Sequence, residues 1–226
     1  MPNKIRIHRV LLIWLLFLPV ISQADYKPMN PILVLGDSLS AGYGIDTTQG
    51  WVKLLEERLK AHATPIEVVN ASISGETSAG GVNRLDRLLS KYNPSIVILE
   101  LGGNDGLRGY PIEKMRQELA NAIDLSQQNN AKVLILGMQI PPNYGPRYSR
   151  LFSESYSMVA DAKAINRVPF FLHDVAIHPE LMQKDGIHPT AAGQPQMLDN
   201  VWPELWSMIR QLQQSTPSAK VTNVRH

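Results

Sequence analysis

Residues 96–101 have the sequence IVILEL and are followed directly by the polar stretch GGND. Such a run, apolar on both faces and rich in β-branched residues, is typical of a strand buried in a parallel sheet. Four other segments share this character: residues 32–35 (ILVL), 66–70 (IEVVN), 133–138 (VLILGM) and 169–172 (PFFL). We therefore expect five buried strands.

Segments with helical spacing separate the expected strands. In residues 51–61, apolar side chains recur every three or four positions and charged side chains occupy the positions between them. The same pattern occurs in residues 82–92, after Pro111, in residues 152–165 and in residues 197–212. A strand and a helix alternating five times predict one α/β domain, with a parallel sheet covered by helices on both faces.

The composition limits the possible classes of protein. The chain has 226 residues, 44% of them apolar, which suits one domain with a sizeable core. It has no cysteine, which excludes a disulfide scaffold, a zinc ribbon and a cysteine nucleophile. Any metal site would have to consist of His, Asp and Glu side chains. The absence of a clustered basic stretch argues against a nucleic-acid partner.

The first 24 residues have the pattern of a secretory signal peptide. Lys4, Arg6 and Arg9 precede an apolar run at residues 10–21, and SQA follows at residues 22–24. The alternative is an uncleaved anchor, but the run is short for a bilayer span of about 20 residues. We expect cleavage after Ala24 and a periplasmic or secreted protein without a stable membrane anchor.

Removal of this segment leaves a net charge of −1, because it contains three of the 22 basic residues and none of the 20 acidic ones. The expected organisation is a signal peptide at residues 1–24, one catalytic or binding domain at residues 25–212 and a disordered tail at residues 213–226. The tail is polar, contains Pro217 and shows no periodicity.

Polar residues follow the expected strands at the edge where open α/β sheets bind ligands. GDSLS (36–40) follows the first strand, NASISGET (70–77) the second and GGND (102–105) the third. Ser38 could be a nucleophile or an ordinary helix-capping serine. Asn104 could stabilise an oxyanion or belong to a flexible glycine-rich loop spanning residues 102–109.

Two histidines are candidates for a general base. His188 lies three residues after Asp185 across a glycine, and His178 lies four residues after Asp174. An aspartate that holds an imidazole in one tautomer is what a base acting on serine requires. The spacing favours His188 only modestly, so the residues alone leave both histidines open.

Four segments resemble the four sequence blocks of the SGNH (GDSL) hydrolases: GDSLSAGYG (36–44), NASISGET (70–77), LGGNDGLRG (101–109) and DGIHP (185–189). They occur in the family's order and lie within residues 32–195. The segments NASISGE, ELGGNDGLRG and PPNYGPRY are similar to the bacterial periplasmic thioesterase, lysophospholipase and arylesterase branch of that family. Four blocks in order are far more specific than GDSL alone.

The resemblance implies a flavodoxin-like three-layer α/β/α sandwich and a serine hydrolase that cleaves esters or thioesters through an acyl-enzyme. It implies Ser38 as nucleophile, His188 as base and Asp185 as the residue that orients His188. It also implies an oxyanion hole formed by the Ser38 and Gly75 N–H groups and the Asn104 side chain. This chemistry needs no cofactor or metal.

The expected partners are small acyl esters or thioesters, including lysophospholipid, and the expected state is a monomer. Two alternatives remain: a polysaccharide acetyl esterase, and a noncatalytic exported binding module on the same fold. Apolar residues in the two loops after the third and fourth strands are expected to line an acyl site and to favour medium-chain esters over acetate. They are Leu107, Tyr110, Ile140, Pro141, Pro142, Tyr144 and Tyr148. Residues 143–150 are expected to form a surface loop.

Overall fold

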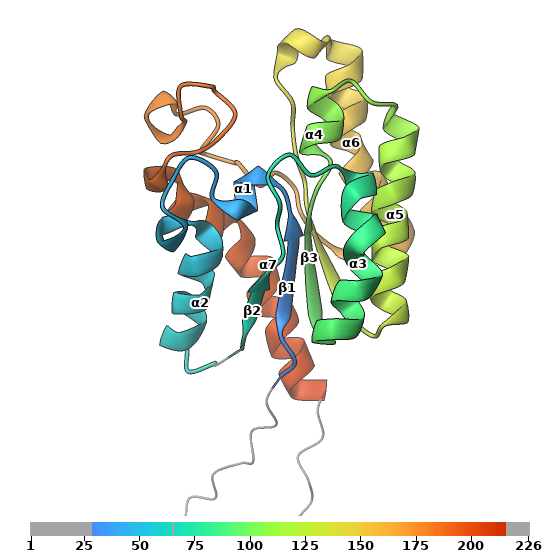
Figure 1. The fold of residues 1–226 in the computed structure, drawn as a ribbon, viewed down its shortest axis with the longest axis vertical. Coiled ribbons are helices and arrows are strands. Elements are labelled where there is room, and N and C mark those ends of the chain that lie inside the picture. Colours follow the sequence, from blue (N-terminus) through green and yellow to red (C-terminus); the bar gives the residue numbers. More distant parts are fainter. Residues whose placement is uncertain (1–28, 65, 216–226) are drawn as a thin grey trace, which may run out of the picture. The chain divides into compact units, whose positions relative to one another are not determined.

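Five parallel strands form one sheet in the order β2-β1-β3-β4-β5 (Figure 1). The strands are β1 (Ile32–Gly36), β2 (Val68–Asn70), β3 (Ile96–Glu100), β4 (Lys132–Leu136) and β5 (Asn166–Val168). The computed structural model describes residues 29–64 and 66–215. The expected signal peptide and the tail from residue 216 therefore lie outside the described residues.

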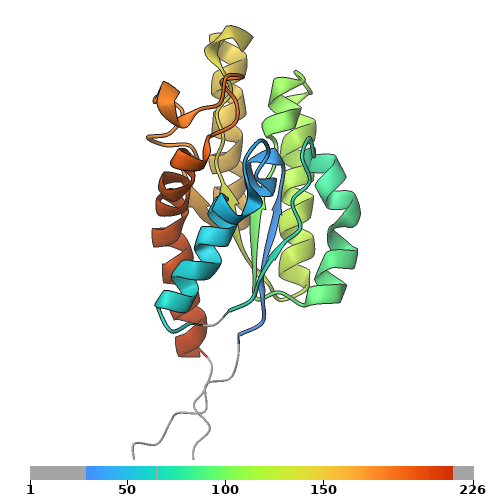
Figure 2. The same ribbon diagram turned by 60° about the vertical axis from the view of Figure 1, so that its left-hand side comes forward.

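Helices cover both faces of this sheet (Figures 1 and 2). Helices α3 (Ser78–Tyr92), α5 (Ile112–Gln128) and α6 (Pro146–Lys163) pack side by side on one face. Helices α2 (Trp51–Ala61) and α7 (Gln194–Ser215) pack together on the other. The expected five-stranded parallel sheet within a three-layer α/β/α sandwich is confirmed.

Short elements complete the fold. Helices α1 (Ser38–Ala41) and α4 (Gly103–Leu107) follow the carboxyl ends of β1 and β3. Four 3-10 turns lie in the connecting segments: η1 (Thr47–Gln49), η2 (Pro142–Tyr144), η3 (Pro179–Leu181) and η4 (Ala191–Gly193). Two of the polar sequence blocks, at residues 36–40 and 102–105, therefore begin short helices at one edge of the sheet.

The two central strands are apolar because both of their faces are covered. Every residue of β1 and β3 is buried, and the two strands pair from Ile32 with Ile96 to Gly36 with Glu100. The one charged side chain among them is Glu100, the last residue of β3. The edge strand β2 is shorter than expected, and none of its residues is fully buried.

The expected strand at residues 169–172 is wrong. Strand β5 ends at Val168, because Pro169 has no N–H to continue the ladder. Phe171 is nevertheless fully buried, since its ring packs edge-on against Trp51 at 5.3 Å between centroids. The apolar run therefore marks a loop that buries Phe171 and Leu172, and hydrophobicity alone does not distinguish such a loop from a strand.

Four other segments differ from expectation. The expected surface loop at residues 143–150 is wrong in its second half, because α6 begins at Pro146, where the missing proline N–H costs nothing. Helix α3 begins at Ser78, four residues early, with Thr77 as its cap. Residues 103–107 form α4 instead of a flexible loop. Helix α7 continues to Ser215, so residues 213–215 are helical.

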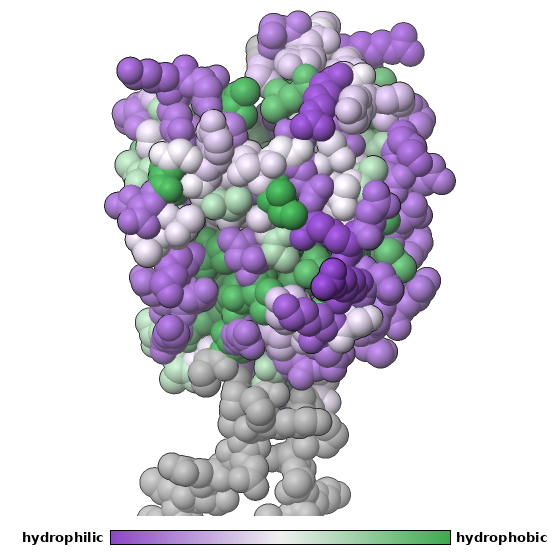
Figure 3. All heavy atoms as spheres, viewed as in Figure 1, coloured by the Kyte–Doolittle hydropathy of each residue, from purple (hydrophilic) through white to green (hydrophobic). Residues whose placement is uncertain are grey.

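Within the described ranges, no helix is both long and apolar enough to cross a membrane. The face drawn in Figure 3 carries mostly hydrophilic side chains, with apolar side chains confined to smaller areas.

Candidate active site

Ser38 is the first residue of α1 and lies two residues after the end of β1. Asp37 caps this short helix, because its Oδ1 accepts a hydrogen bond from the Leu39 N–H at 3.0 Å. Gly42 ends the helix in the left-handed conformation. This tight strand-to-helix turn fixes the Ser38 hydroxyl at the carboxyl edge of the sheet.

His188 links Ser38 to Asp185. Its Nε2 lies 2.8 Å from Ser38 Oγ, and its Nδ1 lies 2.7 Å from Asp185 Oδ2. The contact between Nδ1 and a carboxylate favours the tautomer with hydrogen on Nδ1, which leaves Nε2 free to accept a proton. Ser38 and His188 are 150 residues apart in the sequence. The fold therefore brings the three predicted residues into one hydrogen-bonded chain.

Asp185 is held in its ionised form. Partial burial raises its pKa, but hydrogen bonds from the His188 ring and from the N–H groups of His188 and Ile187 outweigh burial and lower the pKa to about 2. Oδ1 accepts the two backbone bonds at 2.9 and 3.0 Å, while Oδ2 accepts from the ring. The carboxylate is thus oriented by its own loop before it orients the imidazole.

The rival histidine has a different partner. His178 Nδ1 lies 3.4 Å from Glu180 Oε1, and Asp174 pairs with His173 at 3.2 Å. In the part of the chain that is described, neither histidine has a hydrogen bond with Ser38. The structure therefore brings His188, and not His178, to the serine.

Tyr43 and Gln183 support the histidine loop, and sequence reasoning missed both. The Tyr43 ring lies 4.5 Å from the His188 ring, centroid to centroid. Gln183 donates from Nε2 to the carbonyl oxygens of Tyr43 at 2.8 Å and Pro189 at 3.0 Å. Tyr43 belongs to the GDSLSAGYG segment, which was the one available signal.

Two of the predicted oxyanion donors lie in segments outside the Ser38 turn. Asn104 lies in α4, and its Nδ2 donates to Asp37 Oδ2 at 3.0 Å. Gly75 lies in the loop after β2 with a φ of 81°, a conformation that favours glycine. Arg108 fixes this loop, because its Nη2 donates to the Gly75 carbonyl oxygen at 3.0 Å.

Asp105 connects the Gly75 loop with α4, and sequence reasoning did not single it out. It is buried, and its carboxylate accepts from the Ser78 N–H at 2.8 Å and from Ser78 Oγ at 2.7 Å. Ser78 begins α3, three residues after Gly75, and Asp105 follows Asn104. One carboxylate therefore ties the Gly75 loop to the helix that carries Asn104.

A cavity of about 500 Å³ opens beside Ser38, Asn104 and His188. Among the predicted substrate residues, Leu107, Ile140 and Pro141 line it. Most of the remaining wall is apolar and was missed: Leu39, Met138, Phe170, Leu172, Ala176, Ile177, Met182 and Ile187. Two of these residues, Phe170 and Leu172, lie in the segment at residues 169–172 that the sequence predicts as a strand.

The three predicted tyrosines do not line this cavity. Tyr144 donates from its hydroxyl to the Leu107 carbonyl oxygen at 2.8 Å, and Tyr148 donates to that of Tyr110 at 2.9 Å. The lining also excludes Tyr110, which is exposed. Pro142 lies in η2, and the placement of its side chain is outside what the structure describes. The Tyr144 and Tyr148 hydroxyls thus hold the end of α4 and its following turn.

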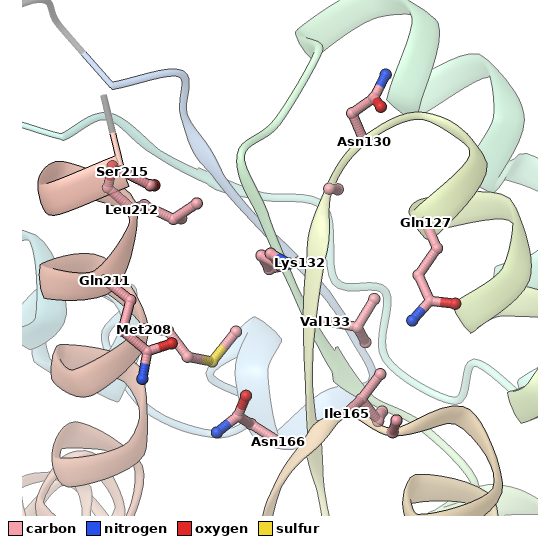
Figure 4. A pocket seen from close by; sticks show the side chains of 12 residues that line it. Gln127, Asn130, Lys132, Val133, Ile165, Asn166, Met208, Gln211, Leu212 and Ser215 are labelled. Carbon is pink, nitrogen blue, oxygen red and sulfur yellow. The ribbon is translucent and has the colours of Figure 1, made fainter. Parts of the chain in front are cut away.

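A second cavity, of about 550 Å³, lies at the opposite end of the sheet (Figure 4). It is lined by the start of β4, the start of β5 and the last turns of α7, and it contains none of the predicted site residues. Within the described ranges, no group of three or more His, Asp or Glu side chains could hold a metal ion.

Comparison with known proteins gives matches over most of the chain. Residues 34–195 match the GDSL-like Lipase/Acylhydrolase family. Esterase TesA of Pseudomonas aeruginosa is 53% identical over 79% of this chain and 89% of its own length. Thioesterase 1/protease 1/lysophospholipase L1 of Escherichia coli K12 is 41% identical over 81% of this chain and 84% of its own length.

A solved structure gives the same result. The psychrotrophic esterase EstA from Pseudoalteromonas sp., inhibited by monoethylphosphonate, superimposes with a TM-score of 0.77 at 44% identity, over 80% of this chain and 99% of that one. The family match and the relatives' identity and coverage both exceed what a shared fold alone would give. The chain therefore belongs to the GDSL-like lipase/acylhydrolase family and is a hydrolase of the esterase type.

Proposed function

We propose that Ser38, His188 and Asp185 form a catalytic triad that hydrolyses acyl esters and thioesters through an acyl-enzyme. The observation that carries this proposal is the hydrogen-bonded chain from Asp185 Oδ2 through His188 to Ser38 Oγ, with contacts of 2.7 and 2.8 Å. In this hydrogen-bonded arrangement, His188 can take a proton from Ser38 while Asp185 stabilises the imidazolium that forms.

The reaction has two steps. His188 Nε2 takes the proton from Ser38 Oγ as that oxygen attacks the carbonyl carbon, and charge develops on the carbonyl oxygen. Collapse expels the alcohol or thiol, which leaves with the proton from His188. In the second step His188 takes a proton from water, the hydroxide attacks the acyl group, and Ser38 recovers its proton as the acid leaves.

The oxyanion is stabilised by the N–H groups of Ser38 and Gly75 and by the Asn104 amide. Support comes from the position of Ser38 at the start of a helix, where its N–H has no partner within the helix. Asn104 uses one hydrogen of its amide for Asp37, so the other is available to an oxyanion. Donors that are fixed before the reaction lower the barrier without reorganisation.

The apolar cavity beside Ser38 holds the acyl chain. Burial of each methylene contributes about 0.8 kcal/mol, so kcat/KM rises with acyl length until the cavity is full. A site that accepted only acetyl groups, as in a polysaccharide acetyl esterase, would not need a cavity of about 500 Å³ with walls that are mostly apolar. Medium-chain esters, thioesters and lysophospholipids are therefore the favoured substrates. The relatives' names support the ester, thioester and lysophospholipid classes.

The protein is exported, with cleavage after Ala24, and acts as a monomer on small acyl substrates. Support for export is the pattern of Lys4, Arg6 and Arg9 before the apolar run at residues 10–21. N-terminal sequencing of exported protein should give Asp25 as the first residue, and retention of Met1 would contradict the proposal.

A panel of p-nitrophenyl esters of increasing acyl length, with an acyl-thioester and a lysophospholipid added, tests the substrate class. We expect kcat/KM to increase from acetate to medium chains, and Ser38→Ala to abolish turnover of every member. A rate that is highest for acetate and falls steadily with length would contradict the acyl cavity and favour the acetyl esterase.

A further inference from the structure

Glu100 is a buried acid beneath the nucleophile turn, outside the proposed triad and oxyanion hole. It is the last residue of β3, and none of its surface is exposed. We infer that Glu100 is a positioning residue that acts in its neutral, protonated form: it fixes the turn around Ser38 and, through Asp37, the Asn104 donor. This inference rests on the proposed function, because it assigns a task to Ser38 and Asn104.

One oxygen of Glu100 binds the chain on both sides of Ser38. Oε2 accepts from the Asp37 N–H at 3.2 Å and from Ser40 Oγ at 2.7 Å. Ser40 is itself fixed, because its Oγ accepts from Trp51 Nε1 at 3.2 Å and its carbonyl oxygen accepts from Asn70 Nδ2 at 2.8 Å. The residues immediately before and two after the nucleophile are therefore anchored to one carboxyl.

The closeness of this contact explains the glycine that begins the GDSLS segment. A Cβ at Gly36 would lie 2.7 Å from Glu100 Oε2 and 2.8 Å from Ser40 Oγ, distances that real side chains do not tolerate. Gly36 and Glu100 also pair directly in neighbouring strands. The strands thus bring the Glu100 carboxyl against the backbone of the turn, where only glycine fits.

Asp37 is the second carboxyl of this network and links it to Asn104. It is 2% exposed, and each of its oxygens accepts a hydrogen bond at 3.0 Å, Oδ1 from the Leu39 N–H and Oδ2 from Asn104 Nδ2. Both oxygens of an ionised Asp37 therefore accept a hydrogen bond, which stabilises its negative charge. Movement of Asp37 would displace both the start of α1 and the Asn104 amide.

The surroundings cannot hold two charges. Oε1 of Glu100 is buried without a hydrogen-bond partner, which makes the ionised form of this carboxyl costly. Along the described chain, no Lys or Arg forms an ion pair with Glu100 or Asp37. One proton must therefore remain on the pair, and the donors on Asp37 direct it to Glu100.

The electrostatics agree with this assignment. Burial, and then the charge of Asp37, raise the pKa of Glu100 well above its usual range. Burial raises the pKa of Asp37 to about 6, against the lowering effect of Leu39, Asn104 and His188. The nearby Tyr156 hydroxyl donates to the Leu101 carbonyl oxygen at 3.0 Å, and Asp105 is occupied by Ser78. Of the two carboxyls, Glu100 is therefore the one that keeps the proton and Asp37 the one that ionises first as the pH rises.

Infrared spectroscopy of the purified enzyme at about pH 8 tests the proton directly. Protonated carboxylic acids have a carbonyl stretch that carboxylates lack, and ordinary Asp and Glu side chains are ionised at this pH. We expect the wild-type enzyme to show this band and Glu100→Gln to lose it. Glu118→Gln is the control, since Glu118 is a buried carboxyl on α5 that pairs with Lys114. A wild-type spectrum without the band, or a band that Glu100→Gln retains, would overturn the inference.

Kinetics test the positioning role. Glu100→Ala should lower kcat by on the order of a hundredfold with little change in KM, because misplaced catalytic groups lose transition-state stabilisation. Glu100→Gln, a neutral isostere, should recover most of the lost kcat, and Glu118→Gln should match the wild type. Equal losses for folded Glu100→Gln and Glu100→Ala would overturn the role of the neutral acid. If Glu100→Ala does not fold, the kcat of Glu100→Gln and the infrared band still test whether Glu100 acts as a neutral acid.

These outcomes are distinct from failure of the proposed function. Labelling of Ser38 by a fluorophosphonate reports the nucleophile in both Glu100 variants. A wild-type enzyme that is labelled at Ser38 but lacks the infrared band would leave the triad standing and remove Glu100 from its role.

Discussion

Asn104 divides its amide between two tasks, because one hydrogen binds Asp37 and the other is assigned to the oxyanion. Asn104→Ala should therefore lower kcat by roughly 10² to 10³ with little change in KM, as expected for a donor that acts on the transition state. Steady-state kinetics on a medium-chain p-nitrophenyl ester measure this. Asn121→Ala on α5 is a matched control, since Asn121 contacts Glu118 and not the site. An unchanged kcat in Asn104→Ala would remove the residue from the oxyanion hole.

Asp185 gives a pH-dependent contribution to stability. Its folded pKa of about 2 is below the ordinary value of 3.8, so the contribution is present above pH 3.8 and is lost as the pH falls toward 2. The side chain is 39% exposed, and solvent screening limits the effect to about 1 kcal/mol. Urea unfolding at a series of pH values should show wild type more stable than Asp185→Asn near pH 6, with the difference vanishing on acidification. A difference that does not change with pH would contradict this assignment.

The choice of histidine shows the limit of sequence reasoning at this scale. Asp185 and His188 have the spacing of a hydrogen-bonded pair, but Asp174 and His178 have a similar one. The decision depends on contacts 150 residues apart, between His188 and Ser38, which local spacing does not contain. The family resemblance indicated His188 as the base, and the fold explains why, because it brings His188 next to Ser38.

Asp105 joins two secondary-structure elements. From α4 its carboxylate accepts hydrogen bonds from the N–H and the hydroxyl of Ser78, at the start of α3. Asp105→Ala leaves a buried N–H without a partner, which should lower the free energy of unfolding by about 2 kcal/mol. It should also lower kcat, since α4 carries Asn104. Denaturant unfolding and kinetics measure the two effects.

Asp46→Ala is the matched control for this change. Asp46 accepts from the N–H and hydroxyl of Thr48 in the same way, but it is exposed and caps η1. Its removal should lower the free energy of unfolding less than Asp105→Ala does and leave kcat unchanged. Equal losses of stability and kcat in the two variants would show that Asp105 has no special role in the site.

Elements were predictable where burial and periodicity agreed. The runs in β1, β3 and β4 and the stripe in α2 gave the α/β order and the parallel sheet. The run at residues 169–172 misled because a loop buries Phe171 and Leu172 there. The start of α6 was missed because Pro146 can begin a helix as well as break one. The first error comes from a tertiary contact, and the second from a residue type that is compatible with two local structures.

At the scale of the whole molecule, the cavity proposed to hold the acyl chain is assembled from the segments that follow β1, β3, β4 and β5, together with the histidine loop. Leu107, at the end of α4, lines it and is partly buried. Leu107→Ala should lower kcat/KM for medium-chain esters more than for acetate, by a factor of up to about 10. Leu88→Ala on α3 is the control, because it makes the same leucine-to-alanine change at a partly buried position that does not line the cavity. A uniform loss across chain lengths would place the acyl chain elsewhere.

The central claim is that Ser38 is the nucleophile of a triad with His188 and Asp185. Mass spectrometry of the enzyme after reaction with a fluorophosphonate tests it most directly, since the reagent bonds covalently to an activated serine. We predict one adduct, on the peptide that contains Ser38, with no adduct in Ser38→Ala and strongly slowed labelling in His188→Ala. Labelling on another serine, or undiminished labelling of folded Ser38→Ala, would contradict the account.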